Sequence, residues 1–183
     1  MTATAKKPMS ADEFLAWGEG QEGRWELHDG AVVAMAPERL LHSQCKGRVY
    51  RSLSAAIERA GSFCEALPDG PGVRIEEDTV FEPDALVYCG SAPPSGSLEI
   101  SNPVVVVEVL SPSTAALDHG VKLTGYFSLS SVMHYLIVDA DRRLVIHHKR
   151  GQGDVIETRI FAEGFLKLQP PGLDLSVDEI FPA

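Results

Sequence analysis

The sequence predicts an α/β domain, more narrowly an α+β domain, built around one mixed sheet. Three observations carry this prediction: hairpin signals in the first half, strand–helix–strand order in the second, and between them the all-apolar run Val104 to Val107. A strand that is apolar on both faces belongs at the centre of a covered sheet. Hairpins combined with one strand–helix–strand unit give mixed pairing. The length of 183 residues suits a single domain, 1–183.

The first part of the chain predicts a short helix, a hairpin and a long helix. Residues 10–17 begin with a capping box, in which a serine is followed three positions later by a glutamate. An Asp-Gly pair between apolar runs predicts a two-residue hairpin over 24–35. Apolar residues recur every three or four positions over 40–60, and a glycine follows, so we expect an amphipathic helix that stops there.

The remaining elements are mostly short strands. We expect strands at 63–67, 72–75, 80–81 and 85–89, a loop over 90–102, the central strand at 104–109, a helix over 113–128, strands at 132–138, 144–148 and 155–161, and a capped turn at 176–180. No internal repeat interrupts this order. The pattern therefore predicts one mixed sheet with its centre at 104–109.

Cysteine usage and the lack of long apolar runs predict the compartment. The 3 cysteines, Cys45, Cys64 and Cys89, form no CxxC pair and are odd in number, as expected of lone thiols in a reducing compartment. The lysines near the start are not followed by the apolar segment of a secretory signal. No apolar run approaches the ~20 residues that span a bilayer. We expect a cytoplasmic protein without a membrane segment.

The charge of the chain bears on nucleic-acid binding. A formal net charge of -10 opposes the simplest kind of phosphate binder. The predicted helix at 40–60 and the residue before it are basic all the same. The cations there that could meet a nucleic-acid backbone are Arg39, Lys46, Arg48 and Arg51. Two interpretations stay open: a contact to phosphates, or the more common solvated helix face.

Two carboxylates are the most informative candidates for chemistry. Glu108 follows the apolar run of the central strand, where an ionised carboxylate is costly unless it is paired or binds a metal. Asp84 opens the strand 85–89, and two such acids at matching strand ends would converge. Oxygen ligands of this kind suit Mg²⁺ or Mn²⁺. The alternatives are a salt-bridged carboxylate for Glu108 and a turn cap for Asp84.

The helix after the central strand supplies further candidates. Asp118, Lys122 and Tyr126 are spaced by four, so they share one helical face. A lysine beside two carboxylates and a metal could orient an attacking water or stabilise phosphate charge. The alternative is an Asp118–Lys122 surface pair. His42, at the start of the basic helix, could be a ligand, a phosphate contact or a half-exposed histidine.

These residues carry a resemblance to a known family. The motifs EPDALV at 82–87 and VEVLSPST at 107–114, followed by Lys122 and Tyr126, resemble the Uma-type family of restriction endonucleases, within the PD-(D/E)XK nuclease superfamily. Residues 26–30 resemble its N-terminal hairpin, and 134–139 resemble the strand after its lysine helix. The resemblance covers nearly the whole chain in the right order.

The resemblance implies a restriction-endonuclease-like core with an N-terminal β-hairpin extension. It implies a Mg²⁺ or Mn²⁺ held by Asp84, Glu108 and the main-chain carbonyl of Val109. It further implies Lys122 as the catalytic lysine, with Glu26 completing the site. The superfamily places a lysine two residues after the acid, but that position here is leucine.

Three functions are weighed against one another. The first is metal-dependent hydrolysis of DNA phosphodiester bonds, by a homodimer because two strands need cutting. The second is a nuclease-fold binding or interaction module without catalysis, which the acidic charge and the leucine in place of lysine favour. The third is metal-dependent hydrolysis of another phosphate-containing substrate. The two candidate metal ligands indicate phosphate chemistry but do not specify the rest of the substrate.

Overall fold

The structure is a computed structural model that describes residues 8–110 and 118–182. Its helices are α1 (Ala11–Gly18), α2 (Leu40–Ala60) and α4 (Leu123–Ser128), with a π-helical turn η1 (Asp118–Lys122) that leads into α4. The strands are β1 (Trp25–His28), β2 (Ala31–Ala34), β3 (Cys64–Pro68), β4 (Val73–Glu76), β5 (Thr79–Phe81), β6 (Ala85–Cys89), β7 (Pro103–Val109), β8 (His134–Asp139), β9 (Leu144–Arg150), β10 (Ile156–Phe161), β11 (Phe165–Leu168) and β12 (Leu173–Ser176).

The main sheet has six strands in the order β10-β9-β8-β7-β6-β3. Strands β7 and β8 are parallel, and the other neighbours are antiparallel. The parallel pair is connected through η1 and α4, as a strand–helix–strand unit requires. The apolar strand β7 has two neighbours on one side and three on the other, so its predicted central place is confirmed, and with it the mixed α/β fold.

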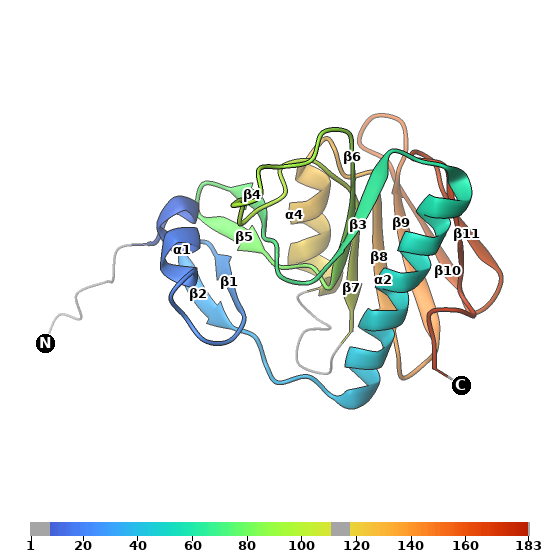
Figure 1. Cartoon of the computed structure of the whole chain (residues 1–183), viewed down its shortest axis with the longest axis horizontal. Helices are drawn as coiled ribbons and strands as arrows, with labels where there is room; N and C mark the ends of the chain where they lie inside the picture. The colour runs from blue at the N-terminus through green and yellow to red at the C-terminus, as the bar shows by residue number, and fades with distance from the viewer. Residues whose placement is uncertain (1–7, 111–117, 183) are drawn as a thin grey trace, which may run out of the picture.

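A second, four-stranded sheet contains the N-terminal hairpin, in the order β2-β1-β5-β4. The hairpin turns at Asp29 and Gly30, whose φ angles of 48° and 76° are the pair of positive values that an Asp-Gly turn adopts. Ahead of it, α1 begins with the predicted capping box, because the side chains of Ser10 and Glu13 each accept the other's backbone N–H. This sheet lies at one end of the molecule, beside the main sheet (Figure 1).

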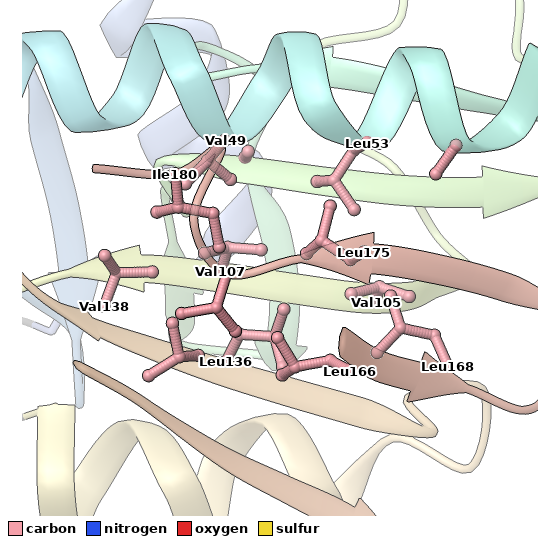
Figure 2. Packing of buried hydrophobic residues seen from close by; sticks show 14 of the residues in the cluster. Val49, Leu53, Val105, Val107, Leu136, Val138, Leu166, Leu168, Leu175 and Ile180 are labelled. Atoms are coloured by element: carbon pink, nitrogen blue, oxygen red, sulfur yellow. The ribbon is translucent and has the colours of Figure 1, made fainter. Parts of the chain in front are cut away.

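Two apolar layers cover the main sheet. Helix α2 and the β11–β12 hairpin pack on one face and α4 on the other (Figure 1). In Figure 2, Val49 and Leu53 of α2 point toward Val105 and Val107 of β7, with side chains of β11 and β12 between the layers. Burying a side chain of this size contributes roughly 1.5–3 kcal/mol, so this layer fixes α2 against the sheet.

The cysteines differ from the expectation. Cys64 and Cys89 face each other across the β3–β6 pair and form a disulfide. The expectation of three lone thiols is therefore wrong for this pair, because the register of two strands far apart in sequence brings them together. Cys45 is a free, buried thiol. Among the described residues no helix is both long and apolar enough to cross a membrane.

Candidate active site

Two carboxylates lie at one end of the central strand pair β6–β7. The antiparallel register aligns Ala85 with Val107, so the next position places Asp84 beside Glu108. The Asp84 N–H donates to the Val107 carbonyl at 3.0 Å and extends the ladder by one residue. The Asp84 carboxylate in turn accepts the Val109 N–H at 2.7 Å. Asp84 and Glu108 are only 4% and 3% exposed, so unpaired charge at either would be costly.

The ammonium group of Lys122 lies between two buried carboxylates. Its Nζ is 2.9 Å from Oε1 of Glu108 and 2.9 Å from Oε1 of Glu26. Tyr126, one turn further on, donates its hydroxyl to the same Glu108 oxygen at 2.7 Å. Lys122 ends the π-helical turn, a rare form that occurs frequently at functional sites. The turn and α4 together direct both side chains at Glu108.

The contacts of Glu26 and Tyr126 determine the ionisation of both side chains. Burial alone would raise the pKa of Glu26, but a hydrogen bond with His28, the charge of Lys122 and the backbone N–H of Glu82 together lower that pKa to about 2. Burial and the negative charge of Glu108 hold the pKa of Tyr126 well above its usual value. Glu26 is therefore anionic and Tyr126 a hydroxyl donor at neutral pH.

Asp84 has cationic partners of its own. Nζ of Lys46 lies 3.0 Å from Oδ1 of Asp84 and also contacts Glu38 and Asp69. The guanidinium of Arg24 lies 3.7 Å from the same Asp84 oxygen. Burial would lower the pKa of Lys46, but the charge of Asp84 and hydrogen bonds to Asp69 and Glu38 raise it above its usual value. Lys46 therefore stays protonated beside these three carboxylates.

His42 contacts the main chain of the site. Its Nε2 lies 2.6 Å from the carbonyl oxygen of Val109. A carbonyl oxygen can only accept, so this nitrogen carries the proton. Nε2 is also 3.7 Å from the Asp84 carboxylate. The histidine thus links the start of α2 to the end of β7, where it helps to fix the carbonyl of Val109.

These groups surround one cavity. It measures about 210 Å³, and its walls include Asp84, Glu108, Lys122, His42 and the end of β7. The segment before α2 and Asp141, in the turn after β8, also line it. Buried carboxylates and cations, with apolar side chains such as Leu41 and Leu110 beside them, form a pocket of the kind that active sites use.

Comparisons with known proteins show the family of this chain. A sequence profile of the Uma2 family, described as "Putative restriction endonuclease", matches residues 11–179. The chain belongs to the Uma2 family. An uncharacterized protein of Synechocystis sp. is 30% identical over 175 residues, which cover 94% of this chain and 91% of that protein. A second uncharacterized Synechocystis protein is 24% identical over 153 residues, or 82% of this chain and 85% of that protein.

The fold of this Uma2 protein is also found in a solved structure. The crystal structure of a protein from Anabaena variabilis, described as a "putative nuclease", matches it with a TM-score of 0.73 and 19% identity. The match covers 94% of this chain and 97% of that one. The resemblance found in the sequence is thereby confirmed. The family, by its description, indicates a nuclease-like role.

The cations expected to contact nucleic acid divide into two groups. Lys46 is buried among carboxylates, so the expected contact with a nucleic acid does not fit its position. Arg39 lines the cavity, while Arg48 and Arg51 lie further along α2. Asp118 begins η1, but its side chain lies outside the part of the chain that the structure describes. Of these four cations, Arg39, the residue before α2, therefore combines proximity to the cavity with exposure.

Sequence reasoning missed two partners of Asp84. Lys46 follows His42 by four positions, so both lie on one face of α2, and this spacing could have assigned Lys46 to the site. Arg24 precedes β1 and reaches Asp84 only through the packing of the two sheets. No local pattern around Arg24 predicts that contact.

The donor set around the cavity fits a hard divalent cation. Restriction-endonuclease-like proteins as a class use divalent metals, and Mg²⁺ commonly takes one or two carboxylates and completes its shell with water and phosphate. Asp84, Glu108 and the Val109 carbonyl supply oxygens of this type. The carbonyl has a second lone pair beside the one that accepts from His42. Among the described residues, no group of three or more His, Cys, Asp or Glu side chains has metal-binding geometry. A metal here would therefore depend on the carbonyl, water and substrate oxygens.

Proposed function

We propose that this Uma2 protein hydrolyses phosphodiester bonds of DNA with Mg²⁺ or Mn²⁺. The observation that carries the proposal is the pair of buried carboxylates on adjacent strand ends, with the Lys122 ammonium against one of them, in the wall of a single cavity. Carboxylates held in this way, next to a fixed cation, suit phosphoryl chemistry better than they suit acyl or glycosyl transfer. The nuclease-like role of the family supports the choice of substrate.

Each residue has a defined task in this proposal. Asp84, Glu108 and the Val109 carbonyl would hold the ion, which when bound makes water a stronger nucleophile and offsets phosphate charge. Lys122 places a fixed positive charge where the phosphate enters the cavity. Tyr126 holds Glu108 in one orientation through its hydroxyl. Glu26 holds Lys122 from the other side through a 2.9 Å contact.

In this proposal Lys122 supplies the ammonium group that, in the superfamily, comes from a lysine two residues after the acid. Here that residue is Leu110, and the ammonium arrives instead from the end of η1. Chemistry depends on where the charge lies and not on its place in the sequence. The 2.9 Å contact with Glu108 brings the charge to the wall of the cavity.

The proposal is tested by cleavage assays on plasmid and oligonucleotide DNA with Mg²⁺, Mn²⁺ or EDTA. We expect metal-dependent cleavage by the parent and none by Glu108→Gln, which keeps size and shape but loses the charge. Glu163→Gln, at an exposed carboxylate outside the site, is the matched control and should cleave like the parent. Undiminished cleavage by Glu108→Gln would rule out the assigned role.

A second candidate is a nuclease-fold binding module without catalysis. The ion pairs Lys46–Asp84 and Lys122–Glu108 favour it, because they neutralise both carboxylates without a metal. Thermal unfolding distinguishes the two candidates. A metal site gains about 2.7 kcal/mol when free Mn²⁺ is 100 times its Kd, whereas a closed ion cluster gains nothing. The homodimer expected for cutting both strands stays a prediction, which light scattering tests.

A further inference from the structure

A second cavity, of about 420 Å³, lies at the opposite edge of the main sheet from β3, between β9, β10 and β11. The antiparallel register pairs Lys149 with Glu157 and His147 with Arg159, so these four side chains lie on one face of the sheet. Strand β11 adds Lys167 to the same cavity. Residues from three strands thus surround one space that the proposed catalysis does not use.

The charge of this cavity is opposite to that of the chain. Its wall carries three cations and one acid, Glu157, in a protein whose formal net charge is -10. In the part of the chain that the structure describes, neither Lys149 nor Lys167 has an acidic partner within 4.0 Å, and Arg159 is 3.7 Å from Glu157. The cations of the active site, in contrast, are held by carboxylates. The positive charge at β9–β11 remains available to an anion.

His147 is a buried residue of the cavity wall, and His134 lies behind it. Nε2 of His134 lies 2.8 Å from the Pro170 carbonyl and therefore carries a proton, so its Nδ1 accepts from Nε2 of His147 at 2.8 Å. Burial, with positive neighbours such as Lys149, lowers the pKa of His134 to about 4 and that of His147 to about 3. The histidines are therefore neutral, and the positive charge of the cavity comes from lysine and arginine alone.

An aromatic ring stands beside these cations. Phe165 of β11 is 63% exposed and lines the cavity together with the partly buried Phe161. Cations that follow a sugar–phosphate backbone, interleaved with exposed rings on which bases stack, are typical of surfaces that bind single-stranded nucleic acid. A duplex keeps its bases stacked on one another and gains nothing from such a ring.

We propose that this cavity binds a single strand of nucleic acid, with phosphates on Lys149, Arg159 and Lys167 and a base stacked on Phe165. The inference rests on the proposed function and gives the substrate a second anchoring point. Strand β9 begins close to Asp141, which lines the active-site cavity. From there His147 is only about 10 Å along the strand, at ~3.4 Å per residue.

Fluorescence anisotropy in EDTA tests the proposal without any cleavage. The probes are a labelled single-stranded oligonucleotide and the same sequence as a duplex. We expect the full-length parent to bind the single strand more tightly. The double variant Lys149→Ala/Lys167→Ala should bind it at least tenfold more weakly, with a slope of log K against log salt reduced by about 1.4, or ~0.7 per lost contact.

Two further variants complete the design. Phe165→Ala should weaken single-strand binding roughly fivefold or more and leave the salt slope unchanged, because stacking releases no counterions. Arg74→Ala on β4, a partly exposed cation that lines neither cavity, is the control and should stay within twofold of the parent. All of these side chains are at least partly exposed, so the fold should persist.

The outcomes separate this inference from the proposed function. The single-strand site would be overturned if the lysine variant bound within twofold of the parent, or if the Arg74→Ala control lost as much affinity as that variant. Tighter binding of the duplex, or complete displacement of the probe by a free nucleotide at equimolar concentration, would overturn it too. No binding by the parent would overturn it as well. Cleavage that requires Glu108 would survive any of these results, and loss of cleavage alone leaves the binding data intact.

Discussion

Replacing Lys122 by methionine tests the arrangement of the site without any substrate. The substitution keeps an unbranched side chain of similar length and removes the ammonium. Lys122 is 3% exposed, and its Nζ contacts Glu108 and Glu26 at 2.9 Å each. Without the ammonium group, the negative charges of these two buried carboxylates are no longer neutralised by Lys122. We expect the folded state of the metal-free protein to lose stability at pH 7.

The magnitude can be obtained in two ways. Removing one partner of a buried ion pair typically costs about 3–5 kcal/mol. Independently, the pKa of Glu26 is lowered from 4.5 to about 2, with Lys122 among the causes, and each unit is worth about 1.4 kcal/mol. That shift stabilises the folded protein by about 3 kcal/mol above pH 4.5, and the contribution is lost as pH falls from 4.5 through 2. The hydrogen bonds of Glu26 with His28 and with the Glu82 N–H remain in the variant, so only part of this second contribution is lost with Lys122. The expected loss therefore lies at the lower end of the ion-pair range, at about 3 kcal/mol.

Urea unfolding at pH 7 in EDTA measures the loss, and the thermal midpoint should fall on the order of 10 °C. Lys167→Met is the matched control, since Lys167 is exposed and the change in chemistry is the same. We expect the control to change stability by less than about 0.5 kcal/mol. A loss below about 1 kcal/mol for Lys122→Met would show that its ammonium does not hold these carboxylates together.

Other predictions follow from the same contacts. The pKa values of His134 and His147 are about 4 and about 3, below the usual 6.5. Between pH 6.5 and these lower values, the two histidines bind protons in the unfolded chain but not in the folded protein. The free energy of unfolding should therefore fall as the pH drops below 6.5, by about 2 kcal/mol per histidine at pH 5. Urea unfolding at the two pH values measures this loss, and an unchanged free energy at pH 5 would refute the prediction. Tyr126→Phe removes the hydrogen bond to Glu108 and should cost about 1.5–3 kcal/mol by the same assay, whereas Tyr50→Phe on the surface of α2 should cost nothing measurable.

Local patterns predicted the elements that position the site. The uninterrupted valines before Glu108 indicated a strand covered on both faces, and β7 is central. The Asp-Gly pair indicated the hairpin, because this dipeptide accepts the two positive φ values of the turn. Asp84 before an apolar strand suggested a second carboxylate at the same sheet end, where the structure places it. Each of these signals is contained in a few neighbouring residues.

Other features depend on residues distant in sequence. The disulfide between Cys64 and Cys89 and the contact of Lys46 with Asp84 arise only when strands and helix are packed. A lysine on a helix looks like a surface residue until the acids opposite it are known. The β11–β12 hairpin, by contrast, could have been predicted, since 165–168 and 173–175 alternate apolar and polar residues in part around a Pro-Pro-Gly turn.

Calorimetric titration of Mn²⁺ into the parent, Asp84→Asn and Glu108→Gln tests the central claim most directly, because it needs no assumption about the substrate. A metal site between the ends of β6 and β7 predicts one binding event in the parent that disappears in both variants, while Glu163→Gln binds like the parent. Mn²⁺ binding that persists unchanged in either site variant would contradict the account.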